Sequence, residues 1–372
     1  MIEFFVAFCK LNDYHMWNKS GMIVIYVNNG TCSPNRIGDK TLTHRERIEA
    51  LLSGEKPDRM PVSFWRHFYD SESTAEQLKT SMVRFQEEFD WDLMKINPRA
   101  SYHMEDWGNA YEYTGNPEDK PKRLEYAVHK SKDWEKINRL DPSKAEVLAD
   151  HLKAIRLIRK SVGDDLPVVM TVFNPISIAG DLVKDDPFLV DQIRRDPDPL
   201  QRALERITET FIDFSKAAVA AGADGIFFAT TQWASTSRIT EDEYDKFGRK
   251  YDFMLLDEVM PHTKINVLHV CDRCNMLPLF KDYPIKIVNW DMNDETNPDA
   301  AKGAEILKDK VILGGVERKG LLQKGTHAEL EAVVEKYKAF AQKHPFMLGP
   351  DCSIPVTTPD ENLRVIKAKI EH

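Results

Sequence analysis

The sequence predicts an α/β fold, a (β/α)8 TIM barrel, on two observations. Eight short apolar runs recur from Met60 to Cys352, and each is apolar on both faces rather than alternating, which is typical of parallel strands covered on both sides. Amphipathic stretches such as Leu200–Ala221, Glu241–Val259 and His327–Gln342 lie between the runs, and this alternation of strand and helix is typical of a barrel. A doubly wound open sheet is the alternative. The absence of a glycine-rich dinucleotide fingerprint after the first run favours the barrel.

The first predicted helix precedes the strands. Thr43 is a good N-cap residue, and Glu46 stands three positions later, which together predict a capping box. We expect this helix to continue to about Leu52 and to end at Gly54.

The eight predicted strands follow in chain order. They are Met60–Trp65, Leu93–Asn97, Pro167–Phe173, Gly222–Thr230, Ile265–Cys271, Ile285–Asp291, Val311–Glu317 and Phe346–Cys352. A long polar stretch from Ser101 to about Pro142 carries the turn signal EYTGNPEDKP. We interpret it as an insertion after the second strand, with a hairpin at Arg123–His129. Such an insertion can cover an active site, and the alternative is a surface loop without a functional role.

The domain organisation is predicted to be simple. Residues 1–40 follow no clear helix or strand period, so we expect a poorly ordered N-terminal extension, whose place in the mature protein is open. Residues 41–372 are expected to form the barrel.

Composition and charge exclude several functional classes. The chain has 372 residues, with 51 Lys and Arg against 60 Asp and Glu, a formal charge of −9, so nucleic acid is not an expected partner. No apolar run approaches the ~20 residues of a membrane helix. Five cysteines, an odd number, do not form a disulfide framework, and we expect a cytoplasmic protein. A homodimer remains open.

The carboxyl ends of the predicted strands carry a candidate metal site. His269 and Cys271 are two positions apart on one strand, so their side chains share a face. Cys352 ends the eighth strand. One histidine and two cysteines are a ligand set typical of catalytic zinc sites, which have three protein ligands and an open fourth coordination position. A core histidine with two buried thiols is the alternative. Cys274 is a bystander, a fourth ligand or, with Cys271, a redox pair.

From Thr41 onward the chain carries several recognisable motifs. They are LTHRERIEALLSGEKPDRMPV, ADGIFF, LHVC, IVNWD and the tail FMLGPDCSIPVTTPDENLRVI, in which the pattern LGPxCxIPxxTPxENL is intact. By these motifs the chain resembles the uroporphyrinogen decarboxylase superfamily, whose fold is a (β/α)8 barrel.

Two departures separate the chain from the decarboxylases of that superfamily. Their first strand leads into Arg-Gln-Ala-Gly-Arg, where this chain has Trp65-Arg66-His67-Phe68-Tyr69, and their essential Asp is replaced here by the stretch Lys95–Arg99. A tetrapyrrole with many carboxylates needs positive anchors, so the resemblance favours the zinc methyltransferases instead. Their ligand pattern matches His269, Cys271 and Cys352.

That resemblance implies a zinc-bound acceptor thiol such as coenzyme M and a methyl-corrinoid donor on a partner protein. Asp291 and Glu317 would orient His269 or act as a transient fourth ligand, and loop capping or a salt bridge is the alternative for both. The residues expected to shape the pocket are Trp65, Arg66, Asn97, Tyr102, Gln232 and Trp233. Two further hypotheses stay open, a metal-free uroporphyrinogen decarboxylase of porphyrin biosynthesis and a non-catalytic or corrinoid-binding partner.

Overall fold

The computed structural model describes residues 41–371. The predicted N-terminal extension, residues 1–40, lies outside the described residues, and its boundary at residue 40 stays a prediction. The predicted α/β barrel architecture is confirmed for the rest of the chain.

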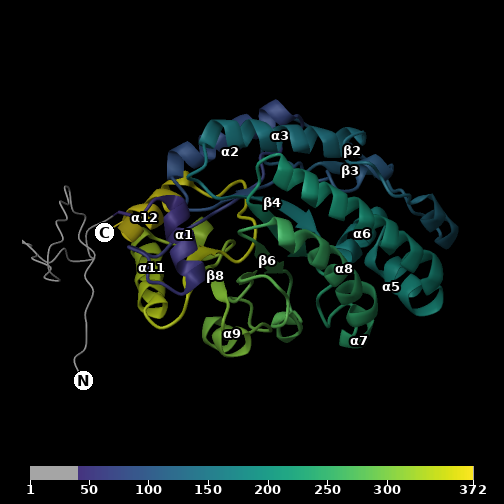
Figure 1. The fold of residues 1–372 in the computed structure, drawn as a ribbon. Helices are drawn as coiled ribbons and strands as arrows, with labels where there is room; N and C mark the ends of the chain where they lie inside the picture. Colours follow the sequence, from purple (N-terminus) through teal and green to yellow (C-terminus); the bar gives the residue numbers. More distant parts are fainter. Residues whose placement is uncertain (1–40, 372) are drawn as a thin grey trace, which may run out of the picture. The chain divides into compact units, whose positions relative to one another are not determined.

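A parallel sheet of seven strands forms the centre of the described unit and curls as a half-barrel (Figure 1). Its strands lie in chain order. They are β1 Met94–Ile96, β4 Val168–Phe173, β5 Gly225–Thr230, β6 Val267–Val270, β7 Ile287–Trp290, β8 Val311–Val316 and β9 Phe346–Pro350.

The first predicted strand, Met60–Trp65, is wrong as a regular strand. Single bridges form instead, one between Val62 and Leu348 of β9 and one between Arg66, directly after the segment, and Ile354. Pro61 has no N–H to donate, and the N–H of Val62 binds the Asp92 carboxylate at 2.8 Å, so no continuous ladder forms. Val62 still contacts both edges of the sheet. It bridges to Leu348 of β9 on one side, and on the other its carbonyl accepts from the N–H of Asp92, two residues before β1, at 2.9 Å.

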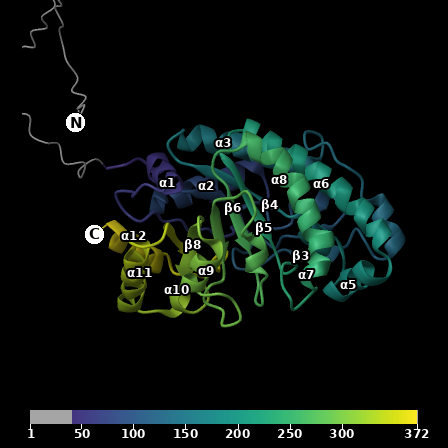
Figure 2. The same cartoon turned by 60° about the horizontal axis from the view of Figure 1, so that its bottom comes forward.

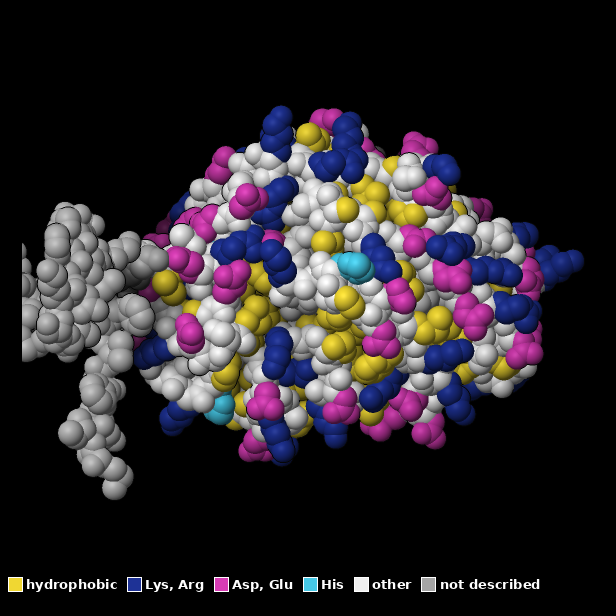
Figure 3. All heavy atoms as spheres, viewed as in Figure 1, with side chains coloured by type: hydrophobic (Ala, Val, Ile, Leu, Met, Phe, Trp, Pro, Cys, Tyr) yellow, Lys and Arg dark blue, Asp and Glu magenta, His cyan; other side chains and the backbone are white. Residues whose placement is uncertain are grey.

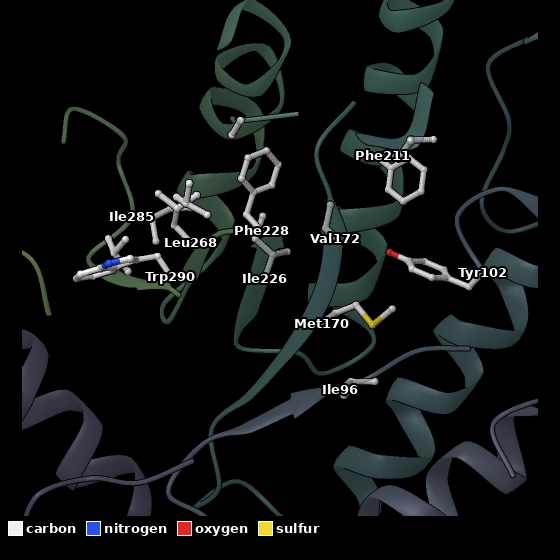
Figure 4. Packing of buried hydrophobic residues seen from close by; sticks show 14 of the residues in the cluster. Ile96, Tyr102, Met170, Val172, Phe211, Ile226, Phe228, Leu268, Ile285 and Trp290 are labelled. Atoms are coloured by element: carbon white, nitrogen blue, oxygen red, sulfur yellow. The ribbon is translucent and has the colours of Figure 1, made fainter. Parts of the chain in front are cut away.

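The two faces of the sheet bury two separate apolar clusters. The outer cluster lies between sheet and helices and includes Ile96, Met170, Val172 and Phe228 (Figure 4). Because side chains alternate along a strand, each strand can contribute to both clusters. The inner cluster lies on the barrel axis and includes Trp65, Leu93, Val169, Phe227, Val267, Ile287, Val311, Leu313 and Met347, with Ile48 and Leu51 of the first helix.

The first helix, α1 His44–Ser53, confirms the sequence prediction. Thr43 accepts from the Glu46 N–H, the Glu46 side chain binds back, and Gly54 ends the helix at φ 79°, the left-handed conformation that glycine adopts most easily.

Nine further helices of eight residues or more follow within residues 41–371. They are α2 Ala75–Phe89, α3 Glu146–Val162, α4 Pro175–Leu182, α5 Asp186–Arg195, α6 Pro197–Ala220, α8 Lys250–Val259, α9 Ala300–Leu307, α11 His327–Ala341 and α12 Asp360–Glu371. Helices cover the outer face of the sheet, with α3, α6 and α8 beside β4, β5 and β6 (Figure 2).

The predicted helix Glu241–Val259 is divided by one irregular turn. It consists of α7 Glu241–Tyr244, the π-helix η3 Asp245–Arg249 and α8. A short helix, α10 Leu321–Lys324, precedes α11.

The insertion after β1 contains a hairpin, as predicted, but its strands are placed differently. β2 Ala110–Glu112 pairs antiparallel with β3 Lys122–Glu125, so only the second strand overlaps the predicted range. Short 3-10 helices precede and follow it, η1 Glu105–Trp107 and η2 Ser131–Lys136; two others, η4 Met260–His262 and η5 Leu277–Phe280, lie near β6.

Charges of both signs are interspersed over the face shown in Figure 3. Among residues 41–371, no helix is long and apolar enough to cross a membrane.

Candidate metal centre and pocket

Three side chains meet at the carboxyl end of the sheet. His269 lies in β6, Cys271 follows that strand directly, and Cys352 follows β9. One ligand atom of each lies within 4.8 Å of the others, and the two sulfurs are 3.9 Å apart. The structure therefore brings together the three residues that the sequence predicts as metal ligands.

Strand alternation explains this convergence. Val267 of β6 points into the inner cluster, so His269, two positions later, faces the barrel interior as well. Cys271 continues the same alternation at the mouth. Cys352 reaches it from three strands away because a sheet curled around an axis brings the ends of distant strands together.

Asn289 of β7 fixes the orientation of the His269 ring. The His269 Nδ1 and the Asn289 Oδ1 are 2.6 Å apart. The Asn289 Nδ2 donates to the carbonyls of Leu313 and Pro350 at 2.8 and 2.9 Å, so its Oδ1 is the atom that faces the imidazole. His269 Nδ1–H is then the donor, and Nε2 carries the lone pair.

The His269 Nε2 is buried and has no hydrogen-bond partner in residues 41–371. A buried polar atom without a partner is costly and calls for a ligand. Zinc fits the donor set, because tetrahedral coordination with Zn–S bonds of about 2.3 Å separates two sulfurs by about 3.8 Å, close to the 3.9 Å between Cys271 and Cys352. No carboxylate belongs to this three-residue group of the described chain.

The two thiols influence each other strongly. A hydrogen bond from Cys271 lowers the pKa of Cys352 well below its usual value, and the same contact raises the pKa of Cys271. The positive charge of Arg318, after β8, opposes the rise in the pKa of Cys271 and adds to the lowering of the pKa of Cys352. The pair therefore holds one thiolate readily, and a cation is needed to hold two.

Cys274 lies outside this group. Its backbone N–H binds the Thr296 hydroxyl at 2.7 Å, and its carbonyl accepts from the Thr236 N–H at 3.0 Å. The three-residue metal group of the described chain does not include its thiol, which supports the bystander interpretation.

The three candidate ligands open onto a cavity of about 100 Å³. Two residues expected in the pocket, Trp65 and Asn97, line it. Lys95 also lines it, and the sequence prediction did not include it as a site residue. Its signal in the sequence is a lysine within an apolar run, two positions from Leu93 and from Asn97, on the face that points inward.

The other residues expected in the pocket do not line this cavity. Arg66 pairs with Asp360 at 2.8 Å, and Gln232 contacts Asp186. Tyr102 is fully buried and donates to the Thr171 carbonyl at 2.6 Å; its ring packs outside the sheet near Phe211 (Figure 4). Trp233 is buried in the outer cluster, against Gly180.

Asp291 and Glu317 do not contact His269. Asp291 accepts from the backbone N–H groups of Asn293 and Asp294, both at 3.1 Å, and burial raises its pKa. Glu317 is exposed and caps the turn before α10 by accepting from the Leu321 N–H. Both carboxylates cap loops, which was their alternative role, and Asn289 contacts His269 in their place; a role as a transient fourth ligand stays a prediction.

The arginines that a carboxylate-rich substrate would need are already paired. Arg66 binds Asp360, Arg99 binds Glu105, and Arg318 lies 3.5 Å from Asp351. None of the three lines the cavity.

Known proteins resemble this chain in sequence. The sequence model described as "Uroporphyrinogen decarboxylase (URO-D)" matches residues 43–371. The methylcobamide:CoM methyltransferase MtaA of Methanosarcina barkeri is 27% identical over 219 residues, an alignment that spans 58% of this chain and 61% of that protein. The methylcobamide:CoM methyltransferase MtbA of Methanosarcina acetivorans is 22% identical over 87% of this chain and 96% of its own length.

Solved structures show the same fold. A methyltransferase from Methanosarcina mazei superposes with a TM-score of 0.73 at 22% identity, over 89% of this chain and 98% of that one. A B12-independent methionine synthase from Shewanella sp. W3-18-1 superposes with a TM-score of 0.52 at 9% identity, over 84% of this chain and 94% of that one.

Proposed function

This chain belongs to the uroporphyrinogen decarboxylase family, and within that family we propose that it is a zinc-dependent methyltransferase. It would move a methyl group from a methyl-corrinoid protein to a thiol. The observation that carries the proposal is the convergence of His269, Cys271 and Cys352 around an unpartnered imidazole nitrogen. The similarity to methylcobamide:CoM methyltransferases supports the same reaction class.

His269, Cys271 and Cys352 would hold the zinc ion and leave a fourth position open to the cavity. Bound zinc supplies one piece of chemistry, which is to bind the acceptor thiol and lower its pKa so that it is held as a thiolate. Asn289 keeps the His269 Nε2 lone pair aimed at the site through its contact with Nδ1. Arg318 contributes a positive charge that favours the two cysteine thiolates.

The apolar wall of the cavity would exclude water from the acceptor sulfur. Trp65, Phe173 and Phe227 line it, and a desolvated thiolate is a stronger nucleophile toward carbon than a hydrated one. In the transfer, a sulfur lone pair forms the new S–C bond, the electron pair of the cobalt–carbon bond stays with cobalt, and the thiol proton passes to solvent. The barrel holds donor and acceptor in line.

Metal content tests the proposal. Wild-type protein purified under reducing conditions without chelator is expected to carry about one zinc per chain, and Cys352→Ala is expected to lose it, since two ligands bind zinc far more weakly than three. The wild type is then expected to methylate a small thiol from free methylcobalamin, followed through the cobalamin absorbance.

Cys274→Ala is the matched control, because it removes a thiol three positions from Cys271 that the metal group does not include. It should keep its zinc. Zinc-free wild-type protein that is well folded would overturn the proposal, and so would zinc retained in full by Cys352→Ala.

A further inference from the structure

A lysine is buried in the wall of the cavity without a carboxylate partner in the described chain, and the charged group that acts on its amine is the Cys352 thiolate. The Lys95 side chain at the end of β1 is 5% exposed, and its amine lies 4.7 Å from the centre of the Phe227 ring and 5.7 Å from that of Trp65. It donates to the Asn97 Oδ1. No carboxylate of residues 41–371 forms an ion pair with it, and burial lowers its pKa to about 7.

Asn97 adds a second unused donor. The residue is 1% exposed, and its Nδ2 is buried without a partner in the described chain. Because Lys95 occupies the Oδ1 of Asn97, the amide and the amine together present only N–H groups to the cavity. Both residues line the same cavity as the three candidate zinc ligands.

The threonine hydroxyl groups that line the cavity with Lys95 and Asn97 already have hydrogen-bond partners. Thr171 donates to the Ile96 carbonyl at 2.6 Å, Thr230 donates to the His269 carbonyl at 3.1 Å, and Thr231 bonds to Ser177 at 2.8 Å. The rings beside the amine are those of Trp65 and Phe227. His67 and Ser353 also line the cavity but are partly exposed, so within the described chain Lys95 and Asn97 are the buried side chains of this wall with N–H groups left for a ligand.

A buried amine and a buried amide that keep unused N–H bonds are costly, and a ligand that supplies acceptor atoms for them removes that cost. An anion supplies them best, because it also pairs with the charge on the amine. Lys95 and Asn97 keep two unused N–H bonds each, and the two oxygens of a carboxylate together accept about four hydrogen bonds. A sulfonate would leave its third oxygen against the aromatic rings.

We propose that Lys95 and Asn97 form a subsite for a carboxylate, so that the acceptor is a short thiol that carries a carboxylate group. This inference rests on the proposed function, because the thiol end of the same molecule would occupy the open position at His269, Cys271 and Cys352. The small volume of the cavity, about 100 Å³, restricts the acceptor to a few heavy atoms between the two ends.

Three thiols of similar length test the subsite: 3-mercaptopropionate, 2-mercaptoethanesulfonate and the neutral 3-mercapto-1-propanol. Their dissociation constants for the zinc-containing wild type are measured by calorimetry, without a methyl donor. We expect 3-mercaptopropionate to bind about 10- to 100-fold more tightly than the neutral thiol, the effect of charge-assisted hydrogen bonds in a buried site, and more tightly than the sulfonate.

Two variants assign the preference to these residues. Lys95→Met keeps the length of the side chain without its charge, and Asn97→Asp places a carboxylate beside the amine that competes with the ligand. Each is expected to remove the preference for 3-mercaptopropionate and to change the affinity for 3-mercapto-1-propanol less than about threefold. Lys310→Met is the matched control, since Lys310 is also buried but donates to the carbonyls of Tyr283 and Ile285.

The outcomes separate the subsite from the proposed function. If zinc is bound and all three thiols bind equally, or if Lys95→Met and Asn97→Asp weaken all three alike, the subsite is wrong and the methyltransferase proposal stands. If no thiol binds the zinc-containing protein, both are wrong. If Lys95→Met does not fold, Asn97→Asp alone decides the question.

Discussion

Two buried polar clusters in this chain differ in whether their atoms are satisfied. In the first, outside the sheet, the carboxylate of Asp252 accepts from Asn174, Tyr244 and Tyr283 at 3.0, 2.8 and 2.7 Å, and none of these side chains has an unpartnered buried atom within residues 41–371. In the second, inside the barrel, the Nε2 of His269 is unpartnered.

This difference distinguishes a buried polar cluster that stabilises the fold from one that binds a ligand. A network that satisfies its own atoms stabilises the packing of the elements that contribute to it. A network that leaves one atom unpartnered and aimed at two thiols is incomplete without a ligand. The outer cluster should therefore control stability, and the inner one should control metal binding.

The largest expected effect comes from Asp252→Ala. It leaves two tyrosine hydroxyls and one amide buried without their acceptor, which we expect to lower the free energy of unfolding by about 3 kcal/mol or more. The measurement is the urea or thermal unfolding of the variant against wild type. The folded variant should keep its zinc, since Asp252 lies on α8, outside the metal group. Loss of zinc from folded Asp252→Ala would show that the two clusters are coupled.

Asn289→Ala tests whether the hydrogen bond that orients His269 contributes to metal binding by the inner cluster. The variant keeps all three candidate ligands but loses the contact that orients His269, so zinc affinity is expected to fall about 10- to 100-fold. Competition with a chromogenic chelator measures it.

Asn362→Ala is the control for that experiment. Asn362 is also a buried asparagine that donates to a carbonyl, that of Leu322 at 2.8 Å, but it lies on α12. Its replacement should lower stability slightly and leave zinc affinity unchanged. An unchanged affinity in Asn289→Ala would contradict the orienting role.

Much of the fold was predictable because parallel strands buried on both faces are apolar runs, and seven of the eight predicted runs contain observed strands. The remaining run, Met60–Trp65, forms no regular strand: Pro61 is visible in the sequence as a residue that cannot donate to the ladder, but the capture of the Val62 N–H by the Asp92 carboxylate is not. The metal group was predictable since a spacing of two on a strand fixes the shared face.

The position of Asn289 beside His269 required information that the sequence does not contain, whereas the buried lysine Lys95 stands in an apolar run and could have been found there. Asn289 lies beside His269 because β6 and β7 pair in the register that places those two residues opposite each other, and register is a property of the assembled sheet. Tyr102 and Trp233 were expected in the pocket, yet both pack outside the sheet. An aromatic residue near a strand end can turn to either side, and only packing decides which.

The smallest predicted effect is a pH dependence of the free energy of unfolding, which arises from Asp252 in the outer cluster. Burial raises the pKa of Asp252 to about 6, above its ordinary value of 3.8, so the folded state holds this proton more tightly than the unfolded state. The resulting stabilisation is complete below about pH 4 and is lost as pH rises through about 6, so that Asp252 alone lowers stability by about 1 to 2 kcal/mol between pH 5 and pH 8. The change appears as a difference between wild type and Asp252→Asn in urea unfolding, because the other titrating groups are common to both. A constant offset between the two proteins over this range would mean that the three hydrogen bonds to Asp252 hold its carboxylate charged throughout, and that the outer cluster owes its stability to an ionised carboxylate.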